Sequence, residues 1–426
     1  MPPISLTGLA LVAGAAFIVP LLLGLAPRLP LPSQVLEIVV GIVIGPAALG
    51  WVRVDLPLQV FALLGLAFLL FLAGLEVEFD RFKGTLLRLS GASYLLSACL
   101  ALLVGYLLAG TGQVRSPLFI AIALGATALG IVIPVLKDAG ELASDLGQLV
   151  TTNATLGEFG SIILLSLFFS GRANSAGATL ILLGWTALAA VLVFLLVSGV
   201  ERTRRLSAEL LRLQATTAEI RVRGAFLLLV AFAALAERLG LEVILGAFIA
   251  GALLSLLDPD RAMTHPMLRP KLEAIGFGIF VPAFFVVTGV RFDLGALLAS
   301  PATVARVPLF LAALVVVRGL PAALFRPRIG GRRATAAALL QSTTLSFLVP
   351  AVQIGQALKV ISPATGAALV AAGLLSVLLF PLAALILLRG AAPAAQLERG
   401  GPPAPLGAIA ISSSGNAGSR LVGTER

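Results

Sequence analysis

The sequence places one carboxylate deep inside a long apolar segment. Glu158 lies at about the thirteenth position of segment 146–170, within the run "NATLGEFGSIILL". An ionisable side chain at the centre of a membrane helix costs about 2.5–3.5 kcal/mol on insertion scales, so such residues mark ion sites or proton relays. Ser161 shares its helix face, Asn153 lies on the same helix, and Gly157 permits close approach of another backbone. Glu158 is therefore the first candidate for binding a proton or a cation.

A second deep ionisable residue is Arg318, some fifteen residues into segment 303–325. Arginine stays protonated in proteins, so Glu158 must carry any transported proton. Arg318 either pairs with Glu158, where proton and cation then compete for one carboxylate, or compensates the carbonyl ends of broken helices. Glu37 and Glu242 lie nearer the ends of their segments, where long side chains reach water, and we expect them to be structural.

The composition indicates an all-α polytopic membrane protein. Of 426 residues, 59% are hydrophobic and 12% charged, and the apolar residues fall in blocks too numerous for a soluble core. One cysteine and one histidine exclude a disulfide framework and a His/Cys metal site, so an ion site must use oxygen ligands. We place about 13 transmembrane helices near 6–25, 33–50, 57–75, 89–110, 116–137, 146–170, 176–199, 223–239, 240–257, 272–290, 303–325, 332–357 and 363–388.

The net charge of +10 is explained by membrane topology, and no nucleic-acid partner is expected. When alternate turns are assigned to opposite sides, 18 basic residues lie on one side and 7 on the other. The positive-inside bias then places the N-terminus outside and the C-terminus in the cytoplasm. Residues 389–426 are rich in Ala, Pro, Gly and Ser without periodicity, which predicts a disordered cytoplasmic tail.

The chain contains two related halves, a first repeat at about 33–170 and a second at about 240–388, joined by a linker helix and loop at about 176–223. "LEIVVGIVIGPAAL" matches "LEVILGAFIAGALL" at an offset of 205, "AGLEVEFD" matches "TGVRFD" at 215, and "ATALGIVIPV" matches "STTLSFLVPA" at 216. Each match pairs helices seven spans apart, and an odd displacement inverts the second copy in the bilayer. The pattern predicts an inverted-topology repeat, a layout of secondary transporters with a midplane site.

The third match predicts two discontinuous, crossing helices. It shares Thr127 with Thr343 and Pro134 with Pro350, and proline removes a backbone donor and blocks a carbonyl, so we expect the prolines to mark the helix breaks. A kinked but continuous helix is the alternative. With freed carbonyls and the two threonine hydroxyls, Glu158 would complete an oxygen-lined site for a hard monovalent cation.

Several motifs, "PSQVLEIVVGIVIGPAALG", "LLFLAGLEVEFD", "ATALGIVIPVLKDAGEL", "LGAFIAGALL" and "PAFFVVTGVRFDL", resemble the monovalent cation:proton antiporter superfamily over about residues 10–388. The resemblance implies a transmembrane antiporter domain at 1–388, a dimerisation domain, and a core domain whose unwound helices flank an ion-binding carboxylate. It also implies a homodimer in the lipid bilayer, elevator-like transport and no cofactor. Family members usually carry Asp-Asp or Asn-Asp where this chain has Gly157-Glu158, and many carry Lys in place of Arg318.

These features predict a transporter rather than an enzyme, exchanging Na⁺ or K⁺ for protons across the inner membrane. Because neither Gly157 nor Arg318 can titrate near neutral pH, one proton per cation remains, and the exchange should be electroneutral. Two alternatives stay open: a transporter of another solute on the same scaffold, such as a Na⁺-coupled organic anion, or a sensor relative that does not transport.

Overall fold

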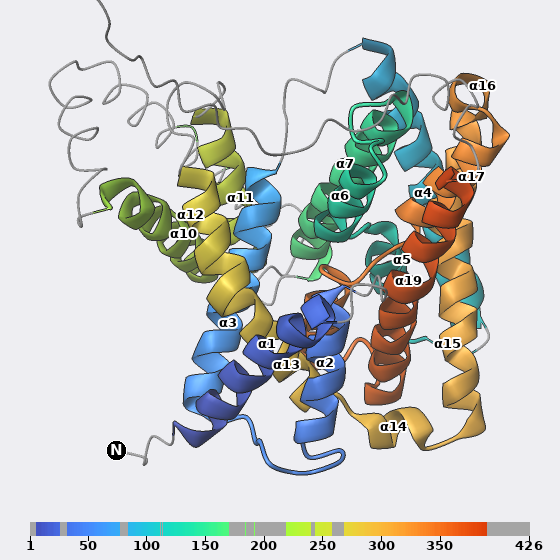
Figure 1. Ribbon diagram of the computed structural model, residues 1–426. Coiled ribbons are helices and arrows are strands. Elements are labelled where there is room, and N and C mark those ends of the chain that lie inside the picture. The colour runs from blue at the N-terminus through green and yellow to red at the C-terminus, as the bar shows by residue number, and fades with distance from the viewer. Residues whose placement is uncertain are drawn as a thin grey trace, which may run out of the picture. The chain divides into compact units, whose positions relative to one another are not determined.

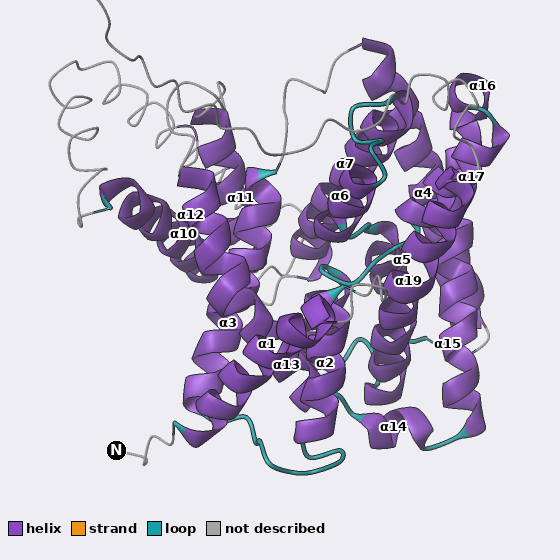
Figure 2. Ribbon diagram, in the orientation of Figure 1, coloured by secondary structure: helices purple, strands orange, loops and turns teal. Residues whose placement is uncertain are grey.

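The computed structural model describes residues 6–25, 32–76, 84–110, 112, 114–169, 184, 191, 219–239, 243–257 and 268–389. In this part of the chain the secondary structure consists of helices joined by loops, and no strand occurs (Figure 2). The predicted all-α class is confirmed. Eight helices or helix series within the described ranges are long and apolar enough to cross a membrane. The span predicted at 176–199 lies outside these ranges except for residues 184 and 191.

Most predicted spans correspond to one helix each. These helices are α1 (Thr7–Leu25), α2 (Ser33–Ile44), α3 (Leu56–Leu75), α4 (Gly84–Gly110), α7 (Asp145–Phe169), α10 (Ile220–Leu239), α11 (Val243–Leu257) and α19 (Pro363–Arg389). Two short helices, α14 and α16, lie in connections, at Leu294–Leu298 and Arg326–Ile329.

Four predicted spans are divided into consecutive pieces. Two of them contain a π-helical turn, in the series α12 (Leu268–Ile275), η2 (Gly276–Phe280) and α13 (Val281–Val290), and in the series α15 (Pro301–Leu314), η3 (Val315–Gly319) and η4 (Leu320–Phe325). The other two are interrupted by non-helical backbone, between α5 (Pro117–Gly125) and α6 (Leu129–Asp138), and between α17 (Gly331–Gln341) and α18 (Leu348–Ala357).

The helices pack in two groups (Figure 1). In the first, α3 packs on α11 and α13, α2 on α13 and α1, and α10 on α11. In the second, α4 packs on α5 and α7, and α15, α17 and α18 all pack on α19. The groups meet where α11 contacts α7 and where α2 contacts α19. The interrupted helices both belong to the second group.

Glycines bring the helices of the first group into backbone contact. A Cβ atom added to Gly289 of α13 would lie 2.8 Å from the Cα of Gly41 in α2, and one added to Gly41 would lie 2.9 Å from the Cα of Gly289. In the same way, a Cβ on Gly74 of α3 would overlap the carbonyl oxygen of Phe248 in α11. Small residues at such crossings let membrane helices gain close van der Waals packing, which replaces the hydrophobic driving force of soluble proteins.

Replacing Gly289 with Ala should therefore destabilise the fold. The added methyl group meets backbone atoms of α2, which cannot rotate away, and overpacking of this kind costs about 1–3 kcal/mol. The measurement is the melting temperature of purified protein in detergent. Gly91→Ala in α4 is the matched control, because nothing lies within 4 Å of its added Cβ atom. Equal melting temperatures for the two variants would contradict the close-packing argument.

The predicted discontinuity of two helices is confirmed, and the position of the breaks is corrected. The breaks lie at 126–128 and 342–347, upstream of the prolines, because Pro134 lies inside α6 and Pro350 inside the first turn of α18. Pro350 lies in a first turn, where proline removes only a donor that has no intrahelical acceptor, so it does not interrupt the helix. Pro134 is the sixth residue of α6 and lies within the helix without ending it. Residues 342–347, between α17 and α18, form turns and loop rather than helix.

Candidate functional site

The two helix breaks are hydrogen-bonded to each other. The Ala128 N–H donates to the Thr343 carbonyl oxygen at 2.8 Å, and the Thr127 hydroxyl donates to the Gln341 carbonyl oxygen at 2.6 Å. These bonds satisfy backbone groups that a membrane interior would otherwise leave without partners. Gln341 is the last residue of α17, so its carbonyl is one of the groups that a helix C-terminus leaves free. The breaks are therefore held together by the atoms that the interruption releases.

Glu158 lies against the first break. Its side chain is 3% exposed, and its Oε2 accepts a hydrogen bond of 3.2 Å from the N–H of Leu129, the first residue of α6. A helix N-terminus carries a partial positive charge and free N–H groups, so it favours a carboxylate over a neutral acid. Ser161, one turn along α7, faces the same break: a methyl group added at Gly125 would lie 3.3 Å from its hydroxyl oxygen.

Arg318 also contacts the first break, through Thr127, and is fully buried. Its Nε donates to the Thr127 hydroxyl at 2.9 Å, Nη1 to the Ser97 hydroxyl at 3.2 Å, and Nη2 to the side-chain and backbone oxygens of Asn153 at 2.9 and 3.2 Å. All of these acceptors are neutral. Within the described ranges, Arg318 and Glu158 form no ion pair with each other or with another residue.

The π-helical turn η3 contributes to the position of Arg318. One extra residue per turn shifts the helix face, and such turns are frequent at functional sites. Arg318 is the fourth residue of this turn and points toward α4, α7 and the first break. The guanidinium group thus connects three elements that are far apart in the sequence.

Gly157 lies directly against the guanidinium group of Arg318. A Cβ atom at Gly157 would lie 2.6 Å from Nη2 of Arg318, 2.9 Å from its Cζ and 3.0 Å from the Gly125 carbonyl oxygen. No larger residue fits while the guanidinium stays in place. The sequence differs from the motif that it resembles at two places, with no acid at position 157 and an arginine at position 318. These two residues are in direct contact in the structure, so the two differences are linked in space.

The structure brings most of the predicted site residues together. Those at or beside the crossing are Glu158, Arg318, Asn153, Gly157, Ser161, Thr127 and Thr343. The Thr343 hydroxyl donates to the carbonyl oxygen of Leu339 in the preceding helix, α17, at 3.2 Å. Ser97 and Gln341 were not predicted. The sequence did contain a signal for Ser97, because Ser90, Ser93 and Ser97 are spaced to lie on one face of a helix. In the structure all three serines are buried in α4.

The expectation that Glu37 lies toward water is wrong. Its side chain is 3% exposed although it lies only one turn after the start of α2. The reason is tertiary: α1 and α13 pack along α2 and cover it. Glu242 lies outside the described residues.

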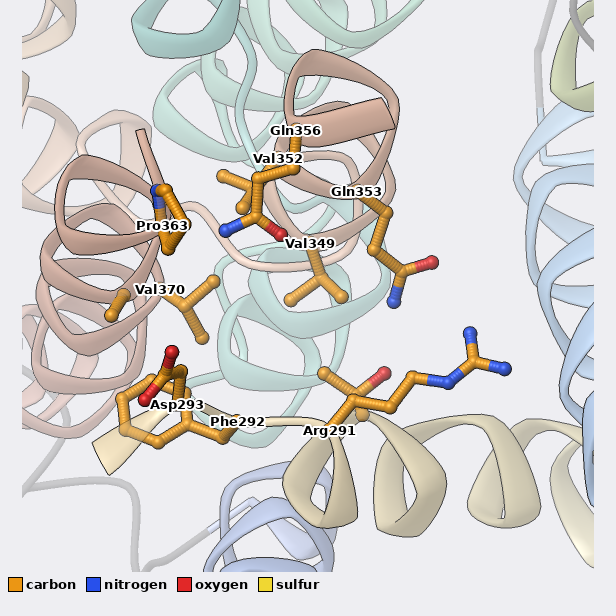
Figure 3. A pocket seen from close by; sticks show the side chains of 12 residues that line it. Arg291, Phe292, Asp293, Val349, Val352, Gln353, Gln356, Pro363 and Val370 are labelled. Carbon is orange, nitrogen blue, oxygen red and sulfur yellow. The ribbon is translucent and has the colours of Figure 1, made fainter. Parts of the chain in front are cut away.

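A cavity of about 440 Å³ separates the end of α13 from α18 and α19 (Figure 3). Thr288 and Arg291 line it from the α13 side, and Val349 and Gln353 from α18. In Figure 3 the side chains of Arg291 and Gln353 extend toward the same side of the cavity. Val349 follows the second break by two residues, so the cavity comes close to the crossing along α18.

The profile of the family described as "Sodium/hydrogen exchanger, transmembrane" matches residues 13–389. The chain is 31% identical to YjbQ of Bacillus subtilis over 393 residues, which are 89% of this chain and 62% of that protein. It is 28% identical to the Na⁺/H⁺-K⁺ antiporter GerN of Bacillus cereus over 272 residues, or 63% of this chain and 67% of GerN. The chain thus spans less than two thirds of the length of YjbQ.

The fold is similar to that of the sodium proton antiporter MjNhaP1 from Methanocaldococcus jannaschii. The TM-score is 0.62 at 18% identity, and the similarity covers 90% of this chain and 98% of that structure. The family match covers the helices that carry both breaks, Glu158 and Arg318. This chain therefore belongs to the family of transmembrane sodium/hydrogen exchangers.

Proposed function

We propose that this protein exchanges a monovalent cation, Na⁺ or K⁺, for protons across the inner membrane, with Glu158 binding the two alternately. The observation that carries the proposal is one buried carboxylate at the crossing of two broken helices, with no cationic partner within the described ranges. A cation and a proton each neutralise such a carboxylate, so each displaces the other. Thr127, Asn153 and Ser161 lie at the same crossing, and their oxygens and the backbone carbonyls of the breaks would supply further ligands.

An inverted repeat accounts for the packing. The offset of 216 between the breaks aligns Gly125 with Gln341, and these are the last residues of α5 and α17. In the first group of helices, α3 packs on α11 while α13 packs on α2, and the sequence pairs α3 with α13 and α2 with α11. Replacing each helix by its sequence counterpart turns the α3–α11 contact into the α13–α2 contact. This symmetry supports a two-fold axis in the membrane plane that relates repeats 33–170 and 240–388.

The division into two groups supports elevator-like alternating access. The group with both breaks, α4–α7 and α15–α19, would move as the core domain against α1–α3 and α10–α13, the dimerisation domain of a homodimer. The cavity between α13 and α18 lies between the two groups of helices. If the N-terminus is outside and the C-terminus is in the cytoplasm, the cavity lies on the outer side of the membrane. It would serve as the outer vestibule. The tail at 389–426 would then lie in the cytoplasm.

The surroundings of Arg318 favour cation exchange over transport of an anion. Four hydrogen bonds to neutral oxygens already engage the guanidinium, so an organic anion would have to displace them. In this proposal Arg318 compensates the carbonyl ends of the crossing helices and leaves Glu158 free to exchange ions.

The test is proton flux in proteoliposomes of purified protein with a preformed pH gradient. Added Na⁺ or K⁺ should dissipate the gradient, whereas a large organic cation such as choline should not. If neither Na⁺ nor K⁺ dissipates the pH gradient, the result would favour a sensor relative that does not transport. If the pH gradient dissipates only when an organic anion is present, the result would favour a transporter of another solute on the same scaffold.

We expect this exchange to be electroneutral. Glu158 is the only group of the crossing that can lose a proton when a cation binds, since Arg318 stays charged and Gly157 has no side chain. One proton then moves per cation, and no net charge crosses the membrane field. The measurement is transport current on a supported membrane under a cation gradient. A current that disappears in Glu158→Gln would show that a second charge moves.

A further inference from the structure

At the second break and at the end of α17 that precedes it, buried side-chain polar atoms have no hydrogen-bond partner among the described residues. The side chain of Gln341 is fully buried, and neither its Oε1 nor its Nε2 has a hydrogen-bond partner within the described ranges. The hydroxyl of Thr344, three residues further, is also fully buried and has no partner there. A buried amide or hydroxyl left without a hydrogen bond costs about 1–3 kcal/mol, so each such group calls for a partner such as a water or an ion.

Both residues are fixed in place by their backbones. The Gln341 carbonyl oxygen accepts the Thr127 hydroxyl at 2.6 Å. The Thr344 N–H donates to the Ser376 hydroxyl of α19 at 3.1 Å, and that hydroxyl also lies 3.1 Å from the Thr344 carbonyl oxygen. The backbone of the break is thus anchored, while the side-chain oxygens stay available. Anchored backbone with free side-chain oxygens is how a preorganised site is built.

We propose that Gln341 and Thr344 form a second binding position for the transported cation, at the α17–α18 break and without a carboxylate. This inference rests on the proposed cation/proton exchange and adds its ligands on the side of the second repeat. The Gln341 Oε1 and the Thr344 hydroxyl replace hydration oxygens of a monovalent cation, as neutral oxygens do in selectivity filters. The Gln341 Nε2 donates to a water that the cation retains.

Binding of a cation at Gln341 and Thr344 would not depend on pH in the way that binding at Glu158 does. Neutral ligands bind the cation without releasing a proton, so this position sets cation affinity, and Glu158 sets the coupling to protons. Thr343, the neighbour of Thr344, directs its hydroxyl back to Leu339 of α17. The orphan hydroxyl at 344 is therefore not a general property of threonines in this break.

The test uses two variants that keep shape and remove polarity, Gln341→Met and Thr344→Val. Each should raise the KM for Na⁺ or K⁺ about tenfold, the effect of losing one polar contact of about 1.4 kcal/mol, with the maximal rate retained. The rise in melting temperature that Na⁺ or K⁺ causes in the wild type should shrink as well, because at a given concentration a ligand that binds more weakly stabilises the folded protein less. Gln59→Met and Thr335→Val, at exposed positions of α3 and α17, are the matched controls.

The melting temperature in choline buffer separates binding from structure. Removing an orphan polar group should leave it unchanged or raise it. A lower melting temperature in choline with an unchanged KM would overturn the proposal, because the two residues would then be structural. An unchanged KM and an unchanged cation-induced shift in both variants would also overturn it, since the orphan atoms would then hold only water. Glu158→Gln, measured in parallel, tests the proposed function separately: its activity does not depend on whether the second position exists.

Discussion

Glu158→Gln should abolish cation-dependent proton flux and leave a folded protein. Glutamine keeps the size of the side chain and an oxygen for the Leu129 N–H, so the first break retains its hydrogen bond. It has no charge to attract a cation and no proton to exchange. In proteoliposomes, flux should fall to the level of protein-free vesicles. Size-exclusion chromatography and the melting temperature in detergent check that the variant is folded.

Glu37→Gln is the matched control for this variant. Both carboxylates are 3% exposed and lie in membrane helices, but Glu37 belongs to α2 in the first group of helices. Glu37→Gln should exchange at the wild-type rate with the same absence of current. If cation/proton exchange persists in Glu158→Gln and is lost in Glu37→Gln, the ion site lies at Glu37 in α2 and not at Glu158.

Replacing Glu158 with Asp is a softer test of the same site. The side chain is shorter by one methylene, so the carboxylate withdraws from the Leu129 N–H by about the length of one carbon–carbon bond, but it still titrates. We expect reduced exchange with an altered preference between Na⁺ and K⁺, measured as the ratio of the two KM values. Complete loss would show that the position of the carboxylate matters as much as its charge.

Arg318→Met should have the second largest effect, a loss of exchange with little change in stability. The variant removes four hydrogen bonds, worth on the order of 2 kcal/mol at about 0.6 kcal/mol each in membranes. It also removes a buried charge that was costly to desolvate, and the two effects oppose each other. Transport should be lost, because under the proposed function Arg318 compensates the carbonyl ends at the crossing, and because Asn153 and Thr127 lose their shared donor.

Gly157→Ala displaces the same guanidinium without removing its charge. The new methyl group would lie 2.6 Å from Nη2 of Arg318 and 3.0 Å from the Gly125 oxygen, so the guanidinium must move and break its bonds to Asn153. Exchange should fall in this variant as well, while Gly91→Ala, with free space around its Cβ atom, should keep it. Wild-type exchange in both Arg318→Met and Gly157→Ala would leave Arg318 with a structural role only.

The sequence by itself determined the membrane fold, the candidate acid and the existence of two breaks. Apolar blocks are decisive because lipid leaves a spanning segment almost no choice but helix. A carboxylate in such a block stands out for the same reason, and this made Glu158 visible. The breaks were predicted because the threonine and proline pattern recurs at matching places in two related halves.

The tertiary structure decided where the breaks lie and what surrounds the charges. The helices end at Gly125 and Gln341 because each break finds hydrogen-bond partners in the other, which are more than 200 residues away in the sequence. A proline can be read from the sequence, but the partner that replaces a helical hydrogen bond cannot. The breaks therefore precede the prolines that suggested them.

The same reason explains the remaining differences. Residue spacing along one helix could not show that the Arg318 side chain lies against Gly157, because this contact joins η3 to α7. Glu37 is buried because neighbouring helices cover it, although its position near a helix start suggested water. Gln341 and Thr344 are ordinary polar residues in the sequence, and only burial without partners distinguishes them. Residue type and periodicity are local properties, whereas burial and hydrogen-bond partners belong to the packed structure.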